Sequence, residues 1–405
     1  MDVDVHGAER TAAAPRADRV ATRAGWGVFG GFAATGLALA TLFSRVPAIR
    51  EELGVSTAQL GLVLLAIPCG SMLALPLSGL VVGRLGSRRT AVATSLLMLA
   101  GMAAAALGFE AGRGGVMAGL FVMGLALGNQ EVALNVEGAA VEQRVGRSLL
   151  PRFHAGFSVG TVAGAALGAA VVAAGVPVGA HMLVVAVGVG VFVPLVVRGF
   201  ITAPQPRERR ERHGRTAWRE PRTLAVGAFV LAMGFTEGTG NDWLAVAMVD
   251  GYGASQATGA WALAVFVAAM TAGRVGGGGL IDRWGRVAVL RASCGLAATG
   301  LALVVFGPST ATAFAGAALW GLGTALGFPV GMSAAGDDPA RAAARVSVVA
   351  SVGYTAFLAG PPLIGLLGDE VGVLRALTVA GAMLALAFLL ASATRPLSPR
   401  PGGTR

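Results

Sequence analysis

Polar residues that could do chemistry interrupt a strongly apolar stretch between Gly128 and Gly138, which reads GNQEVALNVEG. With the apolar residues on either side, the segment is long enough to cross a bilayer. A carboxylate at that depth costs about 2.5–3.5 kcal/mol on insertion scales, so Glu131 needs a compensating role. Glu131 and Asn135 are four apart and share one face of a helix. They predict a proton-exchanging carboxylate beside a polar ligand; the alternative is a Glu that an Arg neutralises to join helices.

A second polar group, Glu237, Asn241 and Asp242, follows the same pattern. Counted from Leu224, Glu237 is predicted to lie past the middle of its helix. Arg274 stands among glycines inside another apolar run and needs a carboxylate or carbonyl partner.

Arg45, at the far end of the first apolar run, is expected to pair with Glu237 or Asp242. The alternative is that the Arg45 side chain lies at the membrane interface and extends its guanidinium to water. Tyr354, Trp243, Trp261 and Trp320 are candidates to stack on a ligand, although each also suits packing.

These residues, together with two basic segments, give three predicted groups. Proton coupling is assigned to Glu131 and Glu237. The substrate cavity is assigned to Asn129, Glu131, Asn135, Glu237, Asn241, Arg274 and Tyr354. Gating is assigned to Arg45, Asp242, Arg84, Arg88, Asp282, Arg283 and Arg286.

The composition explains why these few polar residues matter. Of the 405 residues, 55% are hydrophobic and only 13% charged, whereas soluble domains have about 25% charged residues. The chain is therefore predicted to be an all-α polytopic membrane protein. The formal charge of +10 comes from Arg at the ends of apolar runs, which indicates membrane topology and not nucleic-acid binding.

Apolar runs of suitable length predict twelve transmembrane helices. If the first residues lie inside, 26 of the 31 Arg fall on the inner side and four on the outer side. The chain is therefore expected in the cytoplasmic (inner) membrane with both termini in the cytoplasm. The twelve spans are 25–47, 58–82, 90–109, 115–140, 153–174, 178–199, 223–248, 257–281, 288–306, 311–334, 345–367 and 371–392.

The longest connection divides the chain into two halves. We expect a tail at 1–23, a six-helix bundle at 24–200, a basic linker at 201–222, a second bundle at 223–393 and a tail at 394–405. The end of the second span, GLVVGRLGSRR from Gly79, resembles the end of the eighth, GGLIDRWGR from Gly278, which lies 199 residues later. Gene duplication explains the repeat, and such repeats are typical of secondary transporters.

The pattern G-x-x-x-D-R-x-G-R after the second and eighth spans resembles the signature of the major facilitator superfamily, and the likeness covers essentially the whole chain. It implies two bundles related by pseudo-two-fold symmetry, with the Arg cluster forming ion pairs that close the cytoplasmic side. The second copy is complete at Asp282, Arg283, Gly285 and Arg286, whereas Gly83 replaces the acid in the first. The latch of the first half is therefore expected to be weaker or to use another carboxylate.

A narrower likeness is to the fucose-permease branch and its uncharacterised bacterial relatives. It is carried by Glu131-x-x-x-Asn135, by His154-Ala-Gly-Phe-Ser158 and by Glu237-x-x-x-Asn241. In that branch a carboxylate at the position of Glu131 takes part in proton-coupled sugar uptake. The branch also uses an Asp near the end of the first helix, where this chain has Ser44 and Arg45, so the resemblance does not imply fucose.

The predicted function is a secondary active transporter for a small solute, driven by protons, with a sugar or similar polar solute favoured. The alternatives are efflux of an amphiphilic or cationic compound, for which Glu237 near Trp243 is suited, and a receptor that moves nothing.

No P-loop, catalytic constellation or metal-ligand spacing is found in the sequence, so we expect no enzyme, no cofactor and no metal. The expected partners are the solute, protons and lipid, and the chain is expected to be a monomer.

Overall fold

Helices make up almost all of the part of the chain that the computed structural model describes, residues 14–145, 149–201, 217–338 and 341–397. In the first half these are α1 (Ala14–Ser44), α2 (Val46–Leu53), α3 (Thr57–Leu107), η1 (Gly108–Ala111), α4 (Arg113–Val145), α5 (Leu150–Ala173), α6 (Val178–Val196) and η2 (Val197–Gly199). In the second half they are α8 (Pro221–Tyr252), α9 (Gln256–Trp284), α10 (Arg286–Phe306), α11 (Thr310–Thr324), α12 (Gly327–Ala335), α13 (Ala342–Val371), α14 (Val373–Ala376), α15 (Thr378–Leu390) and η3 (Ala391–Thr394).

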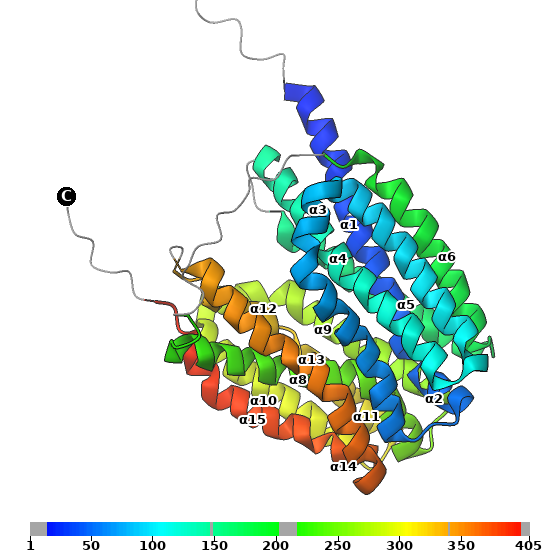
Figure 1. The fold of residues 1–405 in the computed structure, drawn as a ribbon. Helices are drawn as coiled ribbons and strands as arrows, with labels where there is room; N and C mark the ends of the chain where they lie inside the picture. The colour runs from blue at the N-terminus through cyan, green and yellow to red at the C-terminus, as the bar shows by residue number, and fades with distance from the viewer. Residues whose placement is uncertain (1–13, 146–148, 202–216, 339–340, 398–405) are drawn as a thin grey trace, which may run out of the picture.

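The predicted twelve-span, all-α membrane fold is confirmed. Within the described residues, eleven helical stretches are long and apolar enough to cross a membrane. One of them, 57–111, has 55 residues, about twice the length that a bilayer needs. Its backbone leaves the helical region at Gly86 (φ 79°, ψ 161°), so α3 consists of two rods that turn back on each other (Figure 1). Counting both rods gives twelve spans.

The 199-residue repeat is also present in the backbone. Gly86 and Gly285 adopt the same left-handed conformation, with φ of 79° and 77° and ψ of 161° and 158°. Gly54 and Gly253, again 199 apart, have φ of 58° and 63°. These angles disfavour any side chain, which explains glycine at all four positions. The repeat therefore places the same turns in both halves.

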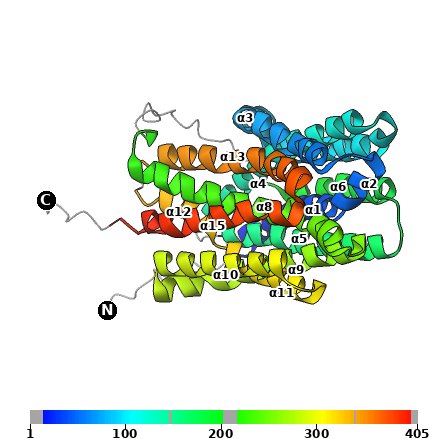
Figure 2. The same cartoon turned by 90° about the horizontal axis from the view of Figure 1, so that it is seen from below.

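Each half has its own packed interior. In the first, a Cβ on Gly119 would lie 2.2 Å from the backbone nitrogen of Ala105, so α4 and α3 are in close contact. In the second, a Cβ on Gly300 would lie 2.3 Å from the backbone nitrogen of Trp320, between α10 and α11. Small residues at such crossings let helices associate within a membrane. Figure 2 shows α13, α8, α15 and α10 side by side in the bundle of the second half, with α13 also packed against α3 of the first half.

The two halves are joined near one end of the molecule. Arg50 forms an ion pair with Asp250, Gln256 donates a hydrogen bond to Glu51, and Ser56 Oγ donates to Asp369 at 2.6 Å. We call this the α2 end. The opposite end of the helices, which carries Gly86, Glu220, Gly285 and Asp337, is the Gly86 end.

A tight helix crossing reinforces the α2 end. A Cβ on Gly61 of α3 would lie 2.5 Å from the Pro361 carbonyl oxygen of α13, and a Cβ on Gly365 would lie 2.7 Å from the Thr57 carbonyl oxygen. In Figure 1 the two halves diverge from this end toward the other. In the described residues, the hydrogen bonds and ion pairs found between the halves all lie at the α2 end.

Candidate functional site

Glu131 lies near the middle of α4, in a bilayer-spanning stretch. Protein atoms surround it on most sides, yet its side chain is accessible, as expected for a residue that lines an internal space. The Asn135 side-chain amide donates to the Glu131 carbonyl oxygen at 2.9 Å. His154 Nε2 lies 3.0 Å from Asn135 Oδ1, and the Phe32 ring lies 4.5 Å from the His154 ring, centroid to centroid. The predicted pair thus joins a histidine of α5.

The second half contributes an ion pair at similar depth. Arg274 Nη2 of α9 donates to Glu237 Oε1 of α8 at 2.7 Å, which satisfies the expected need of Arg274 for a carboxylate. The Asn241 side-chain amide donates to the Glu237 carbonyl oxygen at 3.1 Å. The position of Glu237 differs from the prediction, because α8 extends from Pro221 to Tyr252 and Glu237 is at its centre.

These groups face each other across the two halves. The Glu131 carboxylate lies within electrostatic range of the Tyr354 hydroxyl of α13, and the Arg274 guanidinium lies within electrostatic range of the His154 imidazole. Tyr354 also belongs to an aromatic trio with Phe328 and Phe357, whose ring centroids lie 6.2–6.4 Å apart. We name the six charged or polar members the central polar group: Glu131, Asn135, His154, Glu237, Arg274 and Tyr354.

Arg45 is placed differently from the prediction. Its guanidinium donates to the Val176 carbonyl oxygen at 2.7 Å, and the side chain is 3% exposed. Because Val176 belongs to the same half, this contact does not bridge the halves. The predicted pairing with Glu237 or Asp242 is therefore wrong for this conformation.

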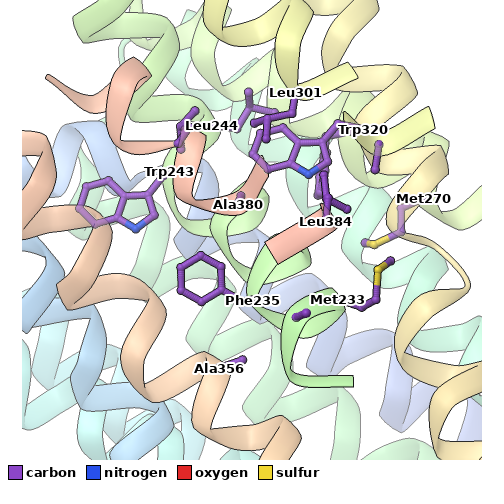
Figure 3. Packing of buried hydrophobic residues seen from close by; sticks show 14 of the residues in the cluster. Met233, Phe235, Trp243, Leu244, Met270, Leu301, Trp320, Ala356, Ala380 and Leu384 are labelled. Carbon is purple, nitrogen blue, oxygen red and sulfur yellow. The ribbon is translucent and has the colours of Figure 1, made fainter. Parts of the chain in front are cut away.

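Other predicted residues lie outside the central polar group. Asp242 is buried in α8 and has no hydrogen bond or ion pair with another described residue. The Asn129 side chain donates to the Leu125 carbonyl oxygen at 2.9 Å, while its own oxygen is buried without a partner among the described residues. Trp243 and Trp320 are fully buried in the apolar core of the second half (Figure 3), which agrees with the packing role that the sequence also allowed.

The predicted gating residues at the Gly86 end include one with a clear partner. Arg286 donates to Asp337 at 2.6 Å, and Arg222 donates to the other oxygen of Asp337 at 2.9 Å. Arg283 lies over the Trp284 ring, 5.3 Å from its centroid. Arg84, Arg88 and Asp282 are exposed and have no ion pair with another described residue. Asp337 was not predicted, because its sequence neighbourhood resembles an ordinary loop.

Glu137 is a second carboxylate whose role the sequence did not indicate. It is buried, accepts a hydrogen bond from Ser87 Oγ at 2.5 Å and accepts another from the backbone of Ile201. Glu137 thus ties α4 to the turn after Gly86, where Gly83 replaces the usual acid. Both contacts lie within the first half, so Glu137 stabilises that bundle and does not itself join the two halves.

Glu220, just before α8, holds the Gly86 end of the second half together. Arg345 donates to its carboxylate at 2.6 Å, and Thr223 donates at 2.9 Å. The hydrogen bond from Arg345 and that from Thr223 hold the pKa of the Glu220 carboxyl below its usual value. Among the described residues no group of three or more metal ligands is found.

Twelve spans in two bundles, joined at one end and carrying charged residues at mid-membrane depth, define a polytopic membrane transporter. The sequence profile of the Major Facilitator Superfamily matches residues 28–240 and 224–405. The chain belongs to this superfamily.

Relatives support the assignment. The chain is 33% identical over 369 residues to the uncharacterised transporter y4wD of Sinorhizobium fredii, covering 90% of this chain and 96% of that protein. It is 30% identical over 368 residues to an uncharacterised MFS-type transporter of Yersinia pestis, covering 90% and 92%. It is 27% identical over 377 residues to membrane protein MosC of Rhizobium meliloti, covering 91% and 90%.

Solved structures show the same fold at low sequence identity. A mutant of the nucleoside transporter NupG superposes with a TM-score of 0.76 at 14% identity, covering 93% of this chain and 98% of that one. A variant of the E. coli fucose:proton symporter FucP gives a TM-score of 0.63 at 16% identity, covering 90% and 97%. The resemblance to the superfamily, and in fold to the fucose permease, is confirmed.

Proposed function

We propose that this transporter moves a small polar solute, a sugar or a similar hydroxylated compound, across the cytoplasmic membrane by proton-coupled alternating access. The observation that carries the proposal is Glu131, an accessible carboxylate at mid-membrane depth beside Tyr354 of the other half. Because Glu237 is engaged by Arg274, Glu131 is the better proton carrier of the two predicted acids. Two similar folds support the substrate class, since they are a nucleoside transporter and a fucose:proton symporter.

The arrangement of the halves supports an inward-facing state. The positive-inside pattern puts the Gly86 end in the cytoplasm, and the halves are tied at the α2 end. Solute and proton would then leave toward the cytoplasm from this state. In the outward-facing state the predicted arginines at the Gly86 end, including Arg84, Arg88 and Arg283, would approach the opposite half, while the α2 end would open around Arg45 and Asp242.

Efflux of an amphiphilic cation is the second candidate. It is favoured by the aromatic trio Phe328, Tyr354 and Phe357 beside the Glu131 carboxylate, since aromatic faces and an acid attract cations. Glu237 and Trp243 do not support it, because Glu237 is paired with Arg274 and Trp243 is buried. The transporter family favours both candidates over a receptor that moves nothing.

The test uses the purified full chain in liposomes with an imposed pH gradient. Sugars, polyols, nucleosides and cationic dyes are screened for solute-driven proton movement with an internal pH dye. We expect flux with a hydroxylated solute, a loss of at least tenfold in Glu131→Gln, and no change in Glu110→Gln, an exposed acid of η1.

Exchange without a gradient separates coupling from binding. If Glu131 carries the proton, Glu131→Gln should still exchange labelled solute for unlabelled solute when the pH is equal on both sides. Retained proton-driven flux in Glu131→Gln would remove Glu131 from coupling. Movement of dyes in place of hydroxylated solutes would select the efflux candidate.

A further inference from the structure

The first half has a surface groove outside the central polar group. It has a volume of about 740 Å³ and follows the second rod of α3 from the Gly86 turn. Its lining residues are Leu85, Arg88, Arg89, Val92, Ala93 and Leu96. Among the described lining residues, which all belong to α3, two carry guanidinium groups at one end and the other four are apolar.

The spacing of these residues places them on one side of the helix. Arg88, Val92 and Leu96 are four residues apart and lie along one face of the helix. From Arg88 to Leu96 the helix rises about 12 Å at 1.5 Å per residue. Leu85 is 43% and Leu96 50% exposed, so the apolar part belongs to the surface that meets lipid. The groove thus passes from a charged helix end into the apolar layer.

Arg88 and Arg89 have no partner of opposite charge in the part of the chain that the structure describes. Neither Arg88 nor Arg89 has a hydrogen bond or ion pair with another described residue. At the same end of the second half, in contrast, Arg286 is paired with Asp337. A pair of exposed guanidinium groups at the membrane surface attracts anions, and its planar donors match a phosphate diester.

The repeat shows that these charges are specific to the first half. Gly86 and Gly285 share a backbone conformation and fix the register at 199 residues. In that register Arg88 and Arg89 correspond to Val287 and Ala288. The conformation of the turn therefore does not need two arginines, and membrane topology requires basic residues at this end without fixing them at these two positions.

We propose that this groove binds one anionic phospholipid. The headgroup phosphate accepts hydrogen bonds from Arg88 and Arg89, and the upper part of an acyl chain lies against Val92 and Leu96. The lipid phosphate then serves as the counter-charge of the two exposed arginines, as Asp337 does for Arg286 in the second half.

The binding experiment uses the purified full chain, delipidated in a neutral detergent. Native mass spectrometry measures retention of phosphatidylglycerol against phosphatidylcholine of the same chain length. We expect preferential binding of phosphatidylglycerol and at least a fivefold loss of that preference in Arg88→Gln/Arg89→Gln. The matched control is Arg283→Gln/Arg291→Gln, which removes two exposed arginines near the same end of the second half and should leave the preference unchanged.

Further arms distinguish the possible sources of phosphate. Inorganic phosphate and glycerophosphoglycerol, which has no acyl chains, should compete at least tenfold more weakly than the intact lipid. Leu96→Gln should weaken the binding of the intact lipid, and competition by glycerophosphoglycerol, which is the headgroup alone, should be unchanged. The conservative variant Arg88→Lys/Arg89→Lys, which keeps the charge, should retain most of the preference and shows whether the glutamine variant fails through misfolding.

Three results would overturn the proposal. Equal loss in the two double glutamine variants would mean that net charge alone attracts the lipid. Equal binding of the two lipids would remove the role of phosphate charge. Competition by inorganic phosphate as strong as that of the lipid would make the groove a free-anion site.

Discussion

The Glu237–Arg274 ion pair is the most directly testable contact of the central polar group. Side-chain exposures of 15% and 27% place it between a buried and a solvated pair. Loss of one partner leaves the other charge without compensation at mid-membrane depth.

We predict that Arg274→Gln and Glu237→Gln each lower stability by about 2 kcal/mol, somewhat below the cost of breaking a fully buried pair. The double variant Glu237→Gln/Arg274→Gln should melt closer to the wild type than either single variant, because no lone charge remains. Thermal unfolding in detergent, followed by tryptophan fluorescence, measures all four proteins. Additive losses would show that the two residues act independently.

The sequence determines some of the residue contacts and leaves others open. Four-residue spacing was enough to place Glu131 and Asn135 on one face. It did not show that Arg45 would donate to Val176, because the direction of a long side chain is set by carbonyls that only the folded chain brings near. Asp337 and Glu137 were missed for the same reason, since their partners, Arg286 and Ser87, are some 50 residues away in sequence.

At the scale of elements, the paired glycine turns give a clean test of backbone strain. Gly285 has φ 77° and ψ 158°, a region that only glycine adopts readily. A Cβ there would meet no atom within 4 Å, and the same is true of Gly276 inside α9. Any difference between alanine substitutions at the two sites must therefore come from the backbone conformation.

Gly285→Ala is predicted to destabilise the protein by about 1–3 kcal/mol. Gly276→Ala, the control, should be neutral or slightly stabilising because alanine favours a helix interior. The melting temperatures of the two variants, measured side by side, provide the comparison. Equal melting temperatures would mean that the turn relaxes at little cost.

The Glu220 contacts give a pH prediction for the start of α8. Since folding lowers the pKa of the Glu220 carboxyl, its contribution to stability is present above the unfolded-state pKa of about 4.3 and disappears as the pH falls through the lower folded-state value. Glu220→Gln should lower stability by about 0.5–1 kcal/mol near pH 7, a modest value because the pair is partly exposed.

The measurement is the melting temperature of wild type and Glu220→Gln from pH 7 down to pH 3. The difference between them should shrink below about pH 4.3. Glu110→Gln, an exposed acid without the Arg345 contact, serves as the control. A difference that stays constant over this range would contradict the assigned electrostatic role.

At the scale of the whole molecule, the ties at the α2 end should set which side of the transporter is open. Removal of the Arg50–Asp250 pair weakens the state in which these halves touch. Each 1.4 kcal/mol lost corresponds to a tenfold change in the population ratio of the two states.

Asp250→Asn and Arg50→Gln are each predicted to shift the population toward a state with the α2 end open. The measurement is double electron–electron resonance between labels at exposed positions Glu52 and Glu370, in a background with Cys69 and Cys294 replaced. A longer distance component should grow in both variants, whereas Glu110→Gln should match the parent. An unchanged distance distribution would show that the remaining contacts of this end, which include the helix crossing at Gly61 and the Ser56–Asp369 hydrogen bond, hold it closed without the ion pair.

The overall architecture was accessible from sequence because it depends on repeated, local properties. Apolar length and Arg placement gave twelve spans, and the 199-residue repeat gave two related halves. Which way the molecule opens could not be predicted, since it depends on contacts such as Ser56 with Asp369, across 313 positions.

Ser56 illustrates how such a tie can be broken repeatedly without damage to the fold. Its hydroxyl oxygen accepts from the Gln59 backbone and caps α3, while its proton goes to Asp369 of the other half. Parting of the halves removes this donated bond and the contacts of Asp369 with Thr57 and Ala58, whereas the cap from Ser56 to Gln59 stays in place. Ser255, its counterpart in the repeat, caps α9 in the same manner. Because the serine cap is formed within the same half, opening of the α2 end does not remove it, and the end of the helix need not unfold in every transport cycle.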